Sequence, residues 1–402
     1  MSMLMRFALF FSTVTFLVCW LSYRLLKRNL GLTARGNRIM AAFFWVSGLL
    51  MISGPVSNRV FNTSATSLGD YLLQWTQFTL LGWIGTVFLV FLFTEILKAL
   101  SRPFDPAKRI FMSTSVARGL IVGSTSASVL GMFEANAGPL TERVEITLRN
   151  LPRSFDGFRI AQISDVHIGP LIHRDYLENV VERVLALNAD AIFITGDLVD
   201  GTVDQLKTEI EPLSRLKAPH GVYFCTGNHE YYSGVHEWIA HLKSIGVEVL
   251  ENSNRVLSRT SVDLRKGTSA TKPEEYLMIA GVHDHSAHRY DPAHRSDPVA
   301  ACKTEKPVKC RILLAHNPFS IEEASAAGYD LQVSGHTHAG QFYPYSFIVK
   351  TILKYSEGLY RVNDRTQLYV NRGTGFWGPP NRLGKRSEIT ELVLRTGLQT
   401  EI

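Results

Sequence analysis

The stretch IAQISDVH, residues 160–167, decides the fold of the second half of this chain. Its apolar beginning is typical of a buried parallel strand, and the run ends abruptly at Asp165. Because Asp165 and His167 are two residues apart, extended backbone would turn their side chains to the same face, where both could bind one ion. We therefore predict a strand that delivers ligand-type side chains at its carboxyl end.

Four later stretches repeat this arrangement. Residues 191–195 lead into Gly196 and Asp197, 222–226 into Gly227, Asn228, His229 and Glu230, 311–315 into His316, and 331–334 into Gly335, His336, Thr337 and His338. Open α/β sheets place their sites at the carboxyl ends of the strands. Apolar residues at helical spacing between the strands, as in residues 175–187, predict an α/β domain with its helices outside the sheet.

The ordered set closely resembles the calcineurin-like metallophosphoesterase family, over roughly residues 155–402, the usual scale of one large domain. The resemblance implies a four-layer α/β/β/α sandwich that binds two divalent metal ions. Carried over by residue, it makes Asp165, His167 and His338 ligands of one ion, Asn228, His316 and His336 ligands of the other, and Asp197 the bridge. His229 matches the family's histidine that is not a ligand and that protonates or steadies the leaving oxygen.

Charge and geometry favour the same chemistry. Two divalent ions outweigh the two aspartates, so the predicted site attracts a phosphate oxyanion. Ions about 3.5–4 Å apart can hold a bridging hydroxide and stabilise an in-line displacement. A proton from His229 to the departing oxygen is worth about 10²–10⁴-fold. Imidazole and oxygen ligands without thiolate suit Mn, Fe, Zn or similar ions, so we predict a hydrolase of phosphoester or pyrophosphate bonds.

The first third of the chain predicts membrane helices. Residues 4–23 carry one charge, at Arg6, and residues 39–58 and 71–94 carry none. A helix needs about 20 apolar residues to cross a bilayer, and each segment is long enough. The fourth segment, 110–133, is weaker because Arg118 interrupts it. We predict a helical transmembrane region of three to four helices over residues 1–133, a linker and first strand over 134–149, and the catalytic domain over 150–402.

Basic residues between these segments predict the orientation. Arg24, Lys27, Arg28, Arg35 and Arg38 follow the first segment, Lys98, Arg102, Lys108 and Arg109 follow the third, and Arg59 alone follows the second. The positive-inside rule places both basic connections in the cytoplasm. The catalytic domain is extracytoplasmic if the fourth segment spans, and cytoplasmic if it lies flat. We expect an integral protein of a bacterial inner or plasma membrane with an extracytoplasmic catalytic domain.

The net charge of +6 suggests nucleic acid, but its distribution argues against such a partner. Residues 1–133 hold twelve Lys and Arg against three acidic residues, so the remainder of the chain has a net charge of −3. The basic residues flank the membrane segments, and the catalytic part has no basic stripe of the kind that nucleic-acid binding requires. We predict no nucleic-acid partner.

Four features stay open between alternatives. His283, Asp284, His285, His288 and His294 could contact a third metal or substrate, although a solvated polar loop is favoured. Arg372 or Arg382, in or near the glycine-rich residues 371–380, could contact phosphate, or this segment is a surface turn. Residues 341–360 could accept an acyl chain or enter the bilayer, although core packing is favoured. Cys302 and Cys310 form a disulfide in an oxidising compartment or stay free.

Membrane attachment makes a lipid-linked phosphate the expected substrate. The chain most resembles a bacterial membrane-associated subgroup of the family, related to enzymes that cleave the pyrophosphate of a diacylated UDP-glucosamine. One alternative is a phosphatase or phosphodiesterase of soluble small molecules. Another is a non-catalytic, metal-stabilised interaction module of a membrane complex, which would have no chemical need for His229.

Overall fold

The structure is a computed structural model that describes residues 3–61, 68–100, 106–260 and 274–397. The chain divides into two compact units. One contains residues 1–136 together with the short segments 342–344 and 377–384, and the other contains residues 137–341, 345–376 and 385–402. Arg102, which contributes to the predicted orientation, lies outside the described residues.

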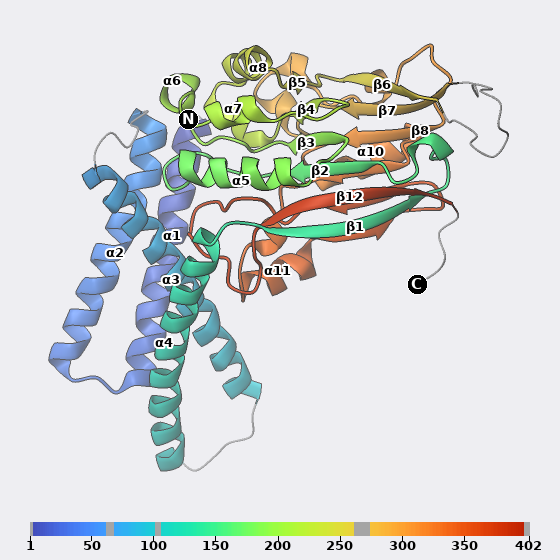
Figure 1. Ribbon diagram of the computed structural model, residues 1–402. Coiled ribbons are helices and arrows are strands. Elements are labelled where there is room, and N and C mark those ends of the chain that lie inside the picture. The colour runs from blue at the N-terminus through green and yellow to red at the C-terminus, as the bar shows by residue number, and fades with distance from the viewer. Residues whose placement is uncertain (1–2, 62–67, 101–105, 261–273, 398–402) are drawn as a thin grey trace. The chain divides into compact units, whose positions relative to one another are not determined.

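The first unit contains four long helices (Figure 1): α1 (Met3–Leu30), α2 (Ala34–Phe61), α3 (Leu68–Leu100) and α4 (Pro106–Asn136). Each includes a stretch long and apolar enough to cross a membrane: 9–30, 34–53, 71–96 and 114–136. Apolar side chains such as Phe10 and Phe133 are exposed on them, at 70% and 71%, whereas Phe44, Met51 and Phe91 pack inside. The segment with Arg118 therefore forms a helix like the other three.

The second unit contains two mixed sheets. The first has the order β1 (Leu140–Leu148), β12 (Glu388–Thr396), β2 (Arg159–Ile163), β3 (Ala191–Thr195), β4 (Val222–Cys225), β5 (Glu248–Val249). The second has the order β10 (Gly358–Arg361), β11 (Gln367–Val370), β9 (Leu331–Ser334), β8 (Cys310–Leu314), β7 (Glu275–Gly281), β6 (Ser253–Arg259). Strands β2 to β5 are parallel, as are β7, β8, β9 and β11, so their carboxyl ends share an edge.

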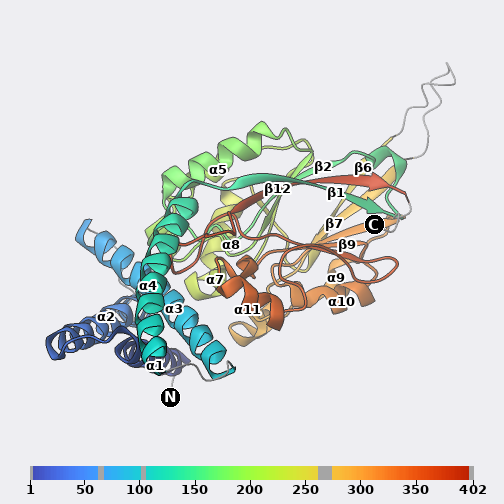
Figure 2. The same ribbon diagram turned by 90° about the horizontal axis from the view of Figure 1, so that it is seen from below.

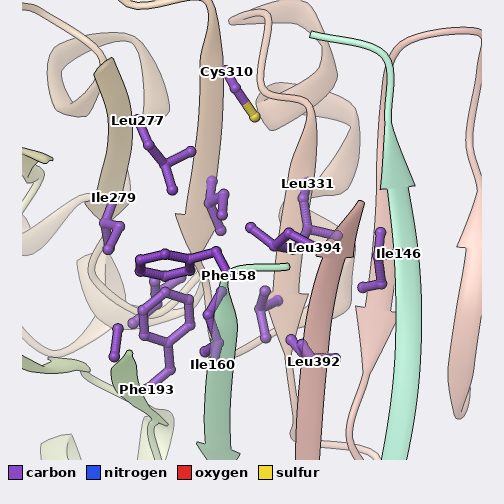
Figure 3. Packing of buried hydrophobic residues seen from close by; sticks show 14 of the residues in the cluster. Ile146, Phe158, Ile160, Phe193, Leu277, Ile279, Cys310, Leu331, Leu392 and Leu394 are labelled. Atoms are coloured by element: carbon purple, nitrogen blue, oxygen red, sulfur yellow. The ribbon is translucent and has the colours of Figure 1, made fainter. Parts of the chain in front are cut away.

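The hydrophobic core lies between the sheets (Figure 3). Ile160 and Phe193 from the first sheet pack with Leu277, Ile279 and Leu331 from the second, and all five are buried. Because side chains alternate along a strand, their neighbours point outward. This inner packing is what joins the two sheets into a sandwich.

Helices cover both outer faces of the sandwich. Met278 and Leu313 pack outward against Ala301 of α9 (Pro298–Ala301) and Ala324 of α10 (Ile321–Ala326). On the other side, α5 (Arg174–Ala186) and α8 (Val235–Ser244) lie over the first sheet (Figures 1 and 2). Apolar residues at helical spacing, including Leu177, form the buried face of α5. The predicted four-layer α/β/β/α fold is confirmed.

The remaining elements are short. They are α6 (Val203–Leu206), α7 (Asn228–Ser233), α11 (Tyr345–Ile352) and the 3-10 helices η1 (Arg153–Phe155), η2 (Glu211–Arg215), η3 (Ala287–Arg289), η4 (Pro292–His294), η5 (Pro318–Ser320) and η6 (His338–Gly340). The sequence predicts a helix over residues 205–216 that Pro212 kinks or divides, and the structure has the two short elements α6 and η2 there, with Pro212 in the first turn of η2. Proline removes a backbone donor and so divides the helix.

Candidate metal centre

Seven predicted ligands follow five parallel strands. Asp165 and His167 come after β2, Asp197 after β3, Asn228 after β4, His316 after β8, and His336 and His338 after β9. β2, β3 and β4 belong to the first sheet, and β8 and β9 to the second. Because the core holds the two sheets face to face, loops that leave them at the same edge can meet.

The first ligand group contains Asp165, His167 and His338, whose ligand atoms lie within 4.8 Å of one another. The Nε2 atoms of His167 and His338 are 3.1 Å apart. His338 Nε2 lies 3.4 Å from Asp165 Oδ1. An ion with bonds of about 2.0–2.1 Å separates tetrahedral ligands by about 3.3 Å, so this group fits a borderline divalent ion.

The second group contains Asp197, His316 and His336. His316 Nε2 lies 3.1 Å from Asp197 Oδ2 and 3.2 Å from His336 Nδ1. Asp197 Oδ2 is also 4.0 Å from His167 Nε2 of the first group. Asn228 Oδ1 is buried without a hydrogen-bond partner, which is costly unless a cation or another donor reaches it. The two groups therefore fit a pair of ions that share Asp197.

Hydrogen bonds from neighbouring residues fix the orientation of the predicted ligands. His316 Nδ1 lies 2.7 Å from the Thr195 carbonyl oxygen, so an Nδ1–H donor there leaves Nε2 for an ion. Ser164 Oγ donates to Asp165 Oδ2 at 2.6 Å. The main-chain N–H of His336 donates to both Asp165 oxygens at 3.0 Å. These bonds connect Asp165 of the first group to the loop that carries His336 of the second group.

Five of the predicted ligands adopt left-handed backbone conformations. The φ angles are 53° at Asp165, 55° at His167, 50° at Asp197, 73° at His336 and 49° at His338. Such conformations cost roughly 1–3 kcal/mol per residue and persist only where the surrounding structure imposes them. They concentrate at this edge of the sandwich, which is typical of a functional site.

Two motif glycines allow the loops to approach closely. A Cβ at Gly335 would overlap Ser164 Oγ and Asp165 Oδ2, and a Cβ at Gly227 would overlap Asp197 Oδ1. Any side chain at either position would displace a predicted ligand. The glycines of these two motifs are therefore required by contact with the carboxylates.

Asp200, which the sequence reasoning missed, connects a ligand to the predicted catalytic histidine. Its Oδ1 lies 3.1 Å from His167 Nδ1 and 2.5 Å from His229 Nδ1. A bridge between Ile168 and Val199 brings the loops after β2 and β3 together and so places Asp200 there. Burial raises the pKa of Asp200, but the charges of His229 and His167 outweigh burial and hold that pKa well below its usual range.

His229 lies beside the shared aspartate. Its main-chain N–H donates to Asp197 Oδ1 at 2.8 Å, and its Nε2 lies 3.9 Å from Asp197 Oδ2. Burial lowers the pKa of His229, but the charges of Asp197 and Asp200 raise it to about 9. Before ions bind, the ring is therefore doubly protonated at neutral pH. The arrangement thus allows a proton donor beside the candidate centre.

Glu230 is a second residue that the sequence reasoning gave no role. Its carboxylate accepts from the main-chain N–H groups of Asp197 at 3.1 Å, Leu198 at 2.8 Å and Gly227 at 2.6 Å. Burial and the charge of Asp197 raise the pKa of Glu230 to about 7. This residue fastens the loop after β3 to the loop after β4.

The loop after β7 differs from the favoured interpretation as solvated. His283 and Asp284 are buried, at 5% and 1% exposed, whereas His288 is exposed. Thr226 Oγ1 accepts from the main-chain N–H of Asp284 at 3.2 Å, and Asp284 Oδ2 is buried without a hydrogen-bond partner. Burial and His294 lower the pKa of His283 to about 4. The expectation of a fully solvated loop is therefore wrong.

The two arginines considered for phosphate binding have positions with protein partners. Arg372 forms ion pairs with Glu142 and Glu388 at 2.5 Å and 2.8 Å. Arg382 is fully buried, and its main-chain N–H donates to the Gly131 carbonyl at 3.0 Å within the helical unit. Contact of either arginine with phosphate stays a prediction.

Two open alternatives are decided by the structure. Cys302 and Cys310 are free thiols, and Cys310 is fully buried at the start of β8, where burial raises its pKa well above the usual range. Residues 345–352 form α11, on which Phe347 and Ile352 are exposed at 62% and 73%. Core packing, the favoured interpretation of residues 341–360, holds for Phe342, which is 4% exposed, and is wrong for Phe347 and Ile352.

Comparison with known proteins agrees with this geometry. The calcineurin-like phosphoesterase family profile matches residues 158–340. The chain is 37% identical over 340 residues to a "Transmembrane protein with metallophosphoesterase domain" of Danio rerio, and the match covers 80% of this chain and 74% of that one. It is 35% identical to the Bos taurus protein of the same name, covering 72% and 64%, and 29% identical to an "Uncharacterized metallophosphoesterase" of Helicobacter pylori strain J99, covering 97% and 98%.

Proposed function

Because this chain belongs to the calcineurin-like metallophosphoesterase family, whose members are hydrolases acting on phosphoester bonds, we propose that it uses a dinuclear metal centre on lipid-linked phosphoesters or pyrophosphates. The observation that carries the proposal is the pair of predicted ligand groups. Asp197 belongs to the second group, and its carboxylate also lies near His167 of the first group. The unpartnered Asn228 Oδ1 supplies a further ligand.

In this proposal each side chain has a defined task. Asp165, His167 and His338 would hold one ion, Asn228, His316 and His336 would hold the other, and Asp197 would contact both. Bound divalent ions would supply Lewis-acid activation of water and positive charge for the phosphoryl group.

His229 donates the Nε2 proton to the leaving oxygen, since its Nδ1 is held by Asp200 and its Nε2 faces Asp197. The same Asp200 oxygen accepts from His167 Nδ1, which keeps the Nε2 lone pair of His167 for an ion. One carboxylate therefore sets the tautomers of a ligand and of the proton donor.

Two features support a lipid-linked substrate. Four helices in the chain are apolar and long enough to span a membrane. Helix α11 begins seven residues after the ligand His338 and exposes Phe347, Ile348 and Ile352. An amphipathic helix with exposed aliphatic and aromatic residues can enter the lipid interface or contact an acyl chain. This helix gives the proposed substrate class an apolar surface close in sequence to the metal ligands.

The proposed orientation places the amino terminus and the catalytic domain outside the cytoplasm. Arg28 near the end of α1 forms an ion pair with Glu95 near the end of α3, and Asn29 Nδ2 donates to Glu95 at 3.2 Å. The two basic connections therefore leave the helical unit at one end, which agrees with a common cytoplasmic side. With four spanning helices, the catalytic domain lies on the opposite side.

A comparison of substrates tests the function. Full-length protein in detergent micelles is stripped of metal and reloaded with Mn²⁺, and hydrolysis of a soluble aryl phosphodiester is compared with that of phosphatidate and a prenyl pyrophosphate in the micelles. We expect metal-dependent turnover on all active substrates and higher kcat/KM on a micellar one. Replacing Phe347→Ser together with Ile352→Ser should lower micellar turnover several-fold and leave the soluble diester unaffected.

The control variant is Val299→Ser, since Val299 on α9 is also exposed, at 60%, and lies on another helix. Turnover confined to soluble substrates, with no effect of the α11 variant, would favour the soluble-phosphoester alternative. A metal-loaded protein that hydrolyses nothing would favour the interaction module.

The orientation has a separate test. In a chain whose four cysteines are replaced by serine, Asp204→Cys places a single thiol at a side chain that is 97% exposed. A membrane-impermeant thiol reagent should label it in intact cells. Labelling only after lysis would place the catalytic domain in the cytoplasm.

A further inference from the structure

A second cluster of metal-type side chains lies outside the ligand groups described above. It combines His236 of α8 with His294 of the 3-10 helix η4 and with Asp291, the residue that precedes η4. The Nε2 of His236 is 3.0 Å from Asp291 Oδ2, and the Nε2 of His294 is 3.9 Å from the same oxygen. Two imidazole nitrogens thus face one carboxylate oxygen from two different elements.

Neighbouring residues hold Asp291 and His294 in orientations that suit metal binding. Asp291 Oδ1 accepts from the main-chain N–H of Ala293 at 2.9 Å, so Oδ2 is the oxygen turned toward the histidines. His294 Nδ1 lies 3.1 Å from the Tyr231 hydroxyl. Metal-binding histidines usually have their second ring nitrogen held in this way, which fixes the tautomer and the ring plane.

His283 extends the cluster inward. Its ring stacks on that of His294, with centroids 4.1 Å apart and planes at 14°, and its Nδ1 lies 3.2 Å from the same Tyr231 hydroxyl. Glu251, His283 and His294 form an overlapping group whose ligand atoms lie within 4.8 Å of one another. Glu251 is already paired with Lys243 at 2.5 Å, so the group with Asp291 is the better ligand set.

We propose that His236, Asp291 and His294 form an additional binding site for a divalent cation of the zinc class, separate from the dinuclear centre. Two imidazoles and one carboxylate are a ligand set that such ions accept, with a fourth position for water. Water has access, because the His236 side chain is 66% exposed. The alternative is that the three side chains form only a hydrogen-bonded network.

A cation at this site would hold the loop after β7 in place on the catalytic domain. His236 belongs to α8, Asp291 and His294 to the loop after β7, and Tyr231 to α7, the helix that begins with Asn228 and His229. Three-point attachment would hold the loop against α8 and, through Tyr231, against α7. The expected role of this cation is structural, since His236, Asp291 and His294 belong to neither of the two ligand groups of the proposed dinuclear centre.

The test counts bound metal in the full-length protein. Detergent-solubilised chain is stripped of metal, dialysed against a buffered Zn²⁺ concentration and analysed for metal per chain. The informative background is Asp197→Asn, in which we expect the dinuclear centre to lose its metal. We expect one equivalent of Zn²⁺ to remain in Asp197→Asn and to be lost when either His236→Ala or Asp291→Asn is added, with at least a tenfold fall in affinity.

The matched control is His288→Ala, because His288 is an exposed histidine on the same loop and should leave the metal count unchanged. A second readout is the visible spectrum of Co²⁺ in place of Zn²⁺, in which a tetrahedral site absorbs strongly. If Asp197→Asn does not fold, wild type is compared with His236→Ala alone, whose side chain is mostly exposed. Equal metal content in the variants and their parents would overturn the proposal.

Discussion

The exchange Asp200→Asn tests whether one carboxylate controls the proton donor. Asp200 Oδ1 lies 2.5 Å from His229 Nδ1. The pKa of His229 is raised from 6.5 to about 9 by Asp197 and Asp200 against the effect of burial. At about 1.36 kcal/mol per pKa unit, this shift corresponds to about 3 kcal/mol in favour of the protonated ring.

Removing one of the two charges should withdraw on the order of half of this energy, which is roughly tenfold in the equilibrium constant for protonation of the ring. A carboxamide that donates to Nδ1 also keeps this nitrogen unprotonated, so it disfavours the doubly protonated ring. Because a general acid contributes about 10²–10⁴-fold, we expect Asp200→Asn to lower kcat by about 10²–10³ on substrates whose leaving group needs a proton.

The assay compares leaving groups. Hydrolysis of aryl and alkyl phosphodiesters of increasing leaving-group pKa is measured for four proteins: wild type, Asp200→Asn, His229→Ala and the double variant. The metal content of each sample is also measured, because Asp200 contacts the predicted ligand His167. The loss should be large for alkyl and small for activated aryl leaving groups. The double variant should match His229→Ala. Asp204→Asn, at a 97% exposed side chain, is the control exchange.

Two results would refute the reasoning. An equal loss on all leaving groups at full metal content would mean that Asp200 does not act through proton transfer. Additive losses in the double variant would mean that Asp200 and His229 act independently.

Three further predictions follow from the same contacts. Asp197→Asn should abolish hydrolysis and dinuclear metal binding, and chelation should lower the thermal midpoint of wild type more than that of this variant. Gly335→Ala should displace Asp165 or Ser164, at about 1–3 kcal/mol of strain, and lower activity at least tenfold by kcat/KM. Leu277→Ala, in the fully buried core, should cost about 2–5 kcal/mol by denaturant unfolding while metal content stays unchanged.

The strands that lead to the ligands could be predicted closely from the sequence. The prediction for residues 191–195 matches β3, and that for 331–334 matches β9. Short apolar runs that end in glycine or a polar residue are typical of buried parallel strands, and this signal is local. The predicted ligands lie at the strand ends for the same reason, so they could be listed before the pairing of the sheets was known.

Contacts between loops could not be predicted in this way. Asp200 reaches His167 and His229 only because the loops after β2 and β3 pair at Ile168 and Val199. The burial of His283 depends on the Tyr231 hydroxyl from another part of the chain. A polar loop sequence is compatible with exposure or with a satisfied buried network, and only tertiary packing decides between them.

The predicted ligands with left-handed backbone link the fold to the proposed metal chemistry. Asp165 and His167 hold their conformations because their main-chain N–H groups donate to the Gly196 and Asp197 carbonyls, at 3.0 Å and 3.2 Å. The Gly335 N–H donates to the His316 carbonyl in the same way. Each strained ligand loop is therefore held by a neighbouring ligand loop. Contacts among the loops offset the strain of roughly 1–3 kcal/mol per residue. Loss of one loop should therefore weaken both predicted ligand groups together. For the same reason, we expect the two ions to bind cooperatively.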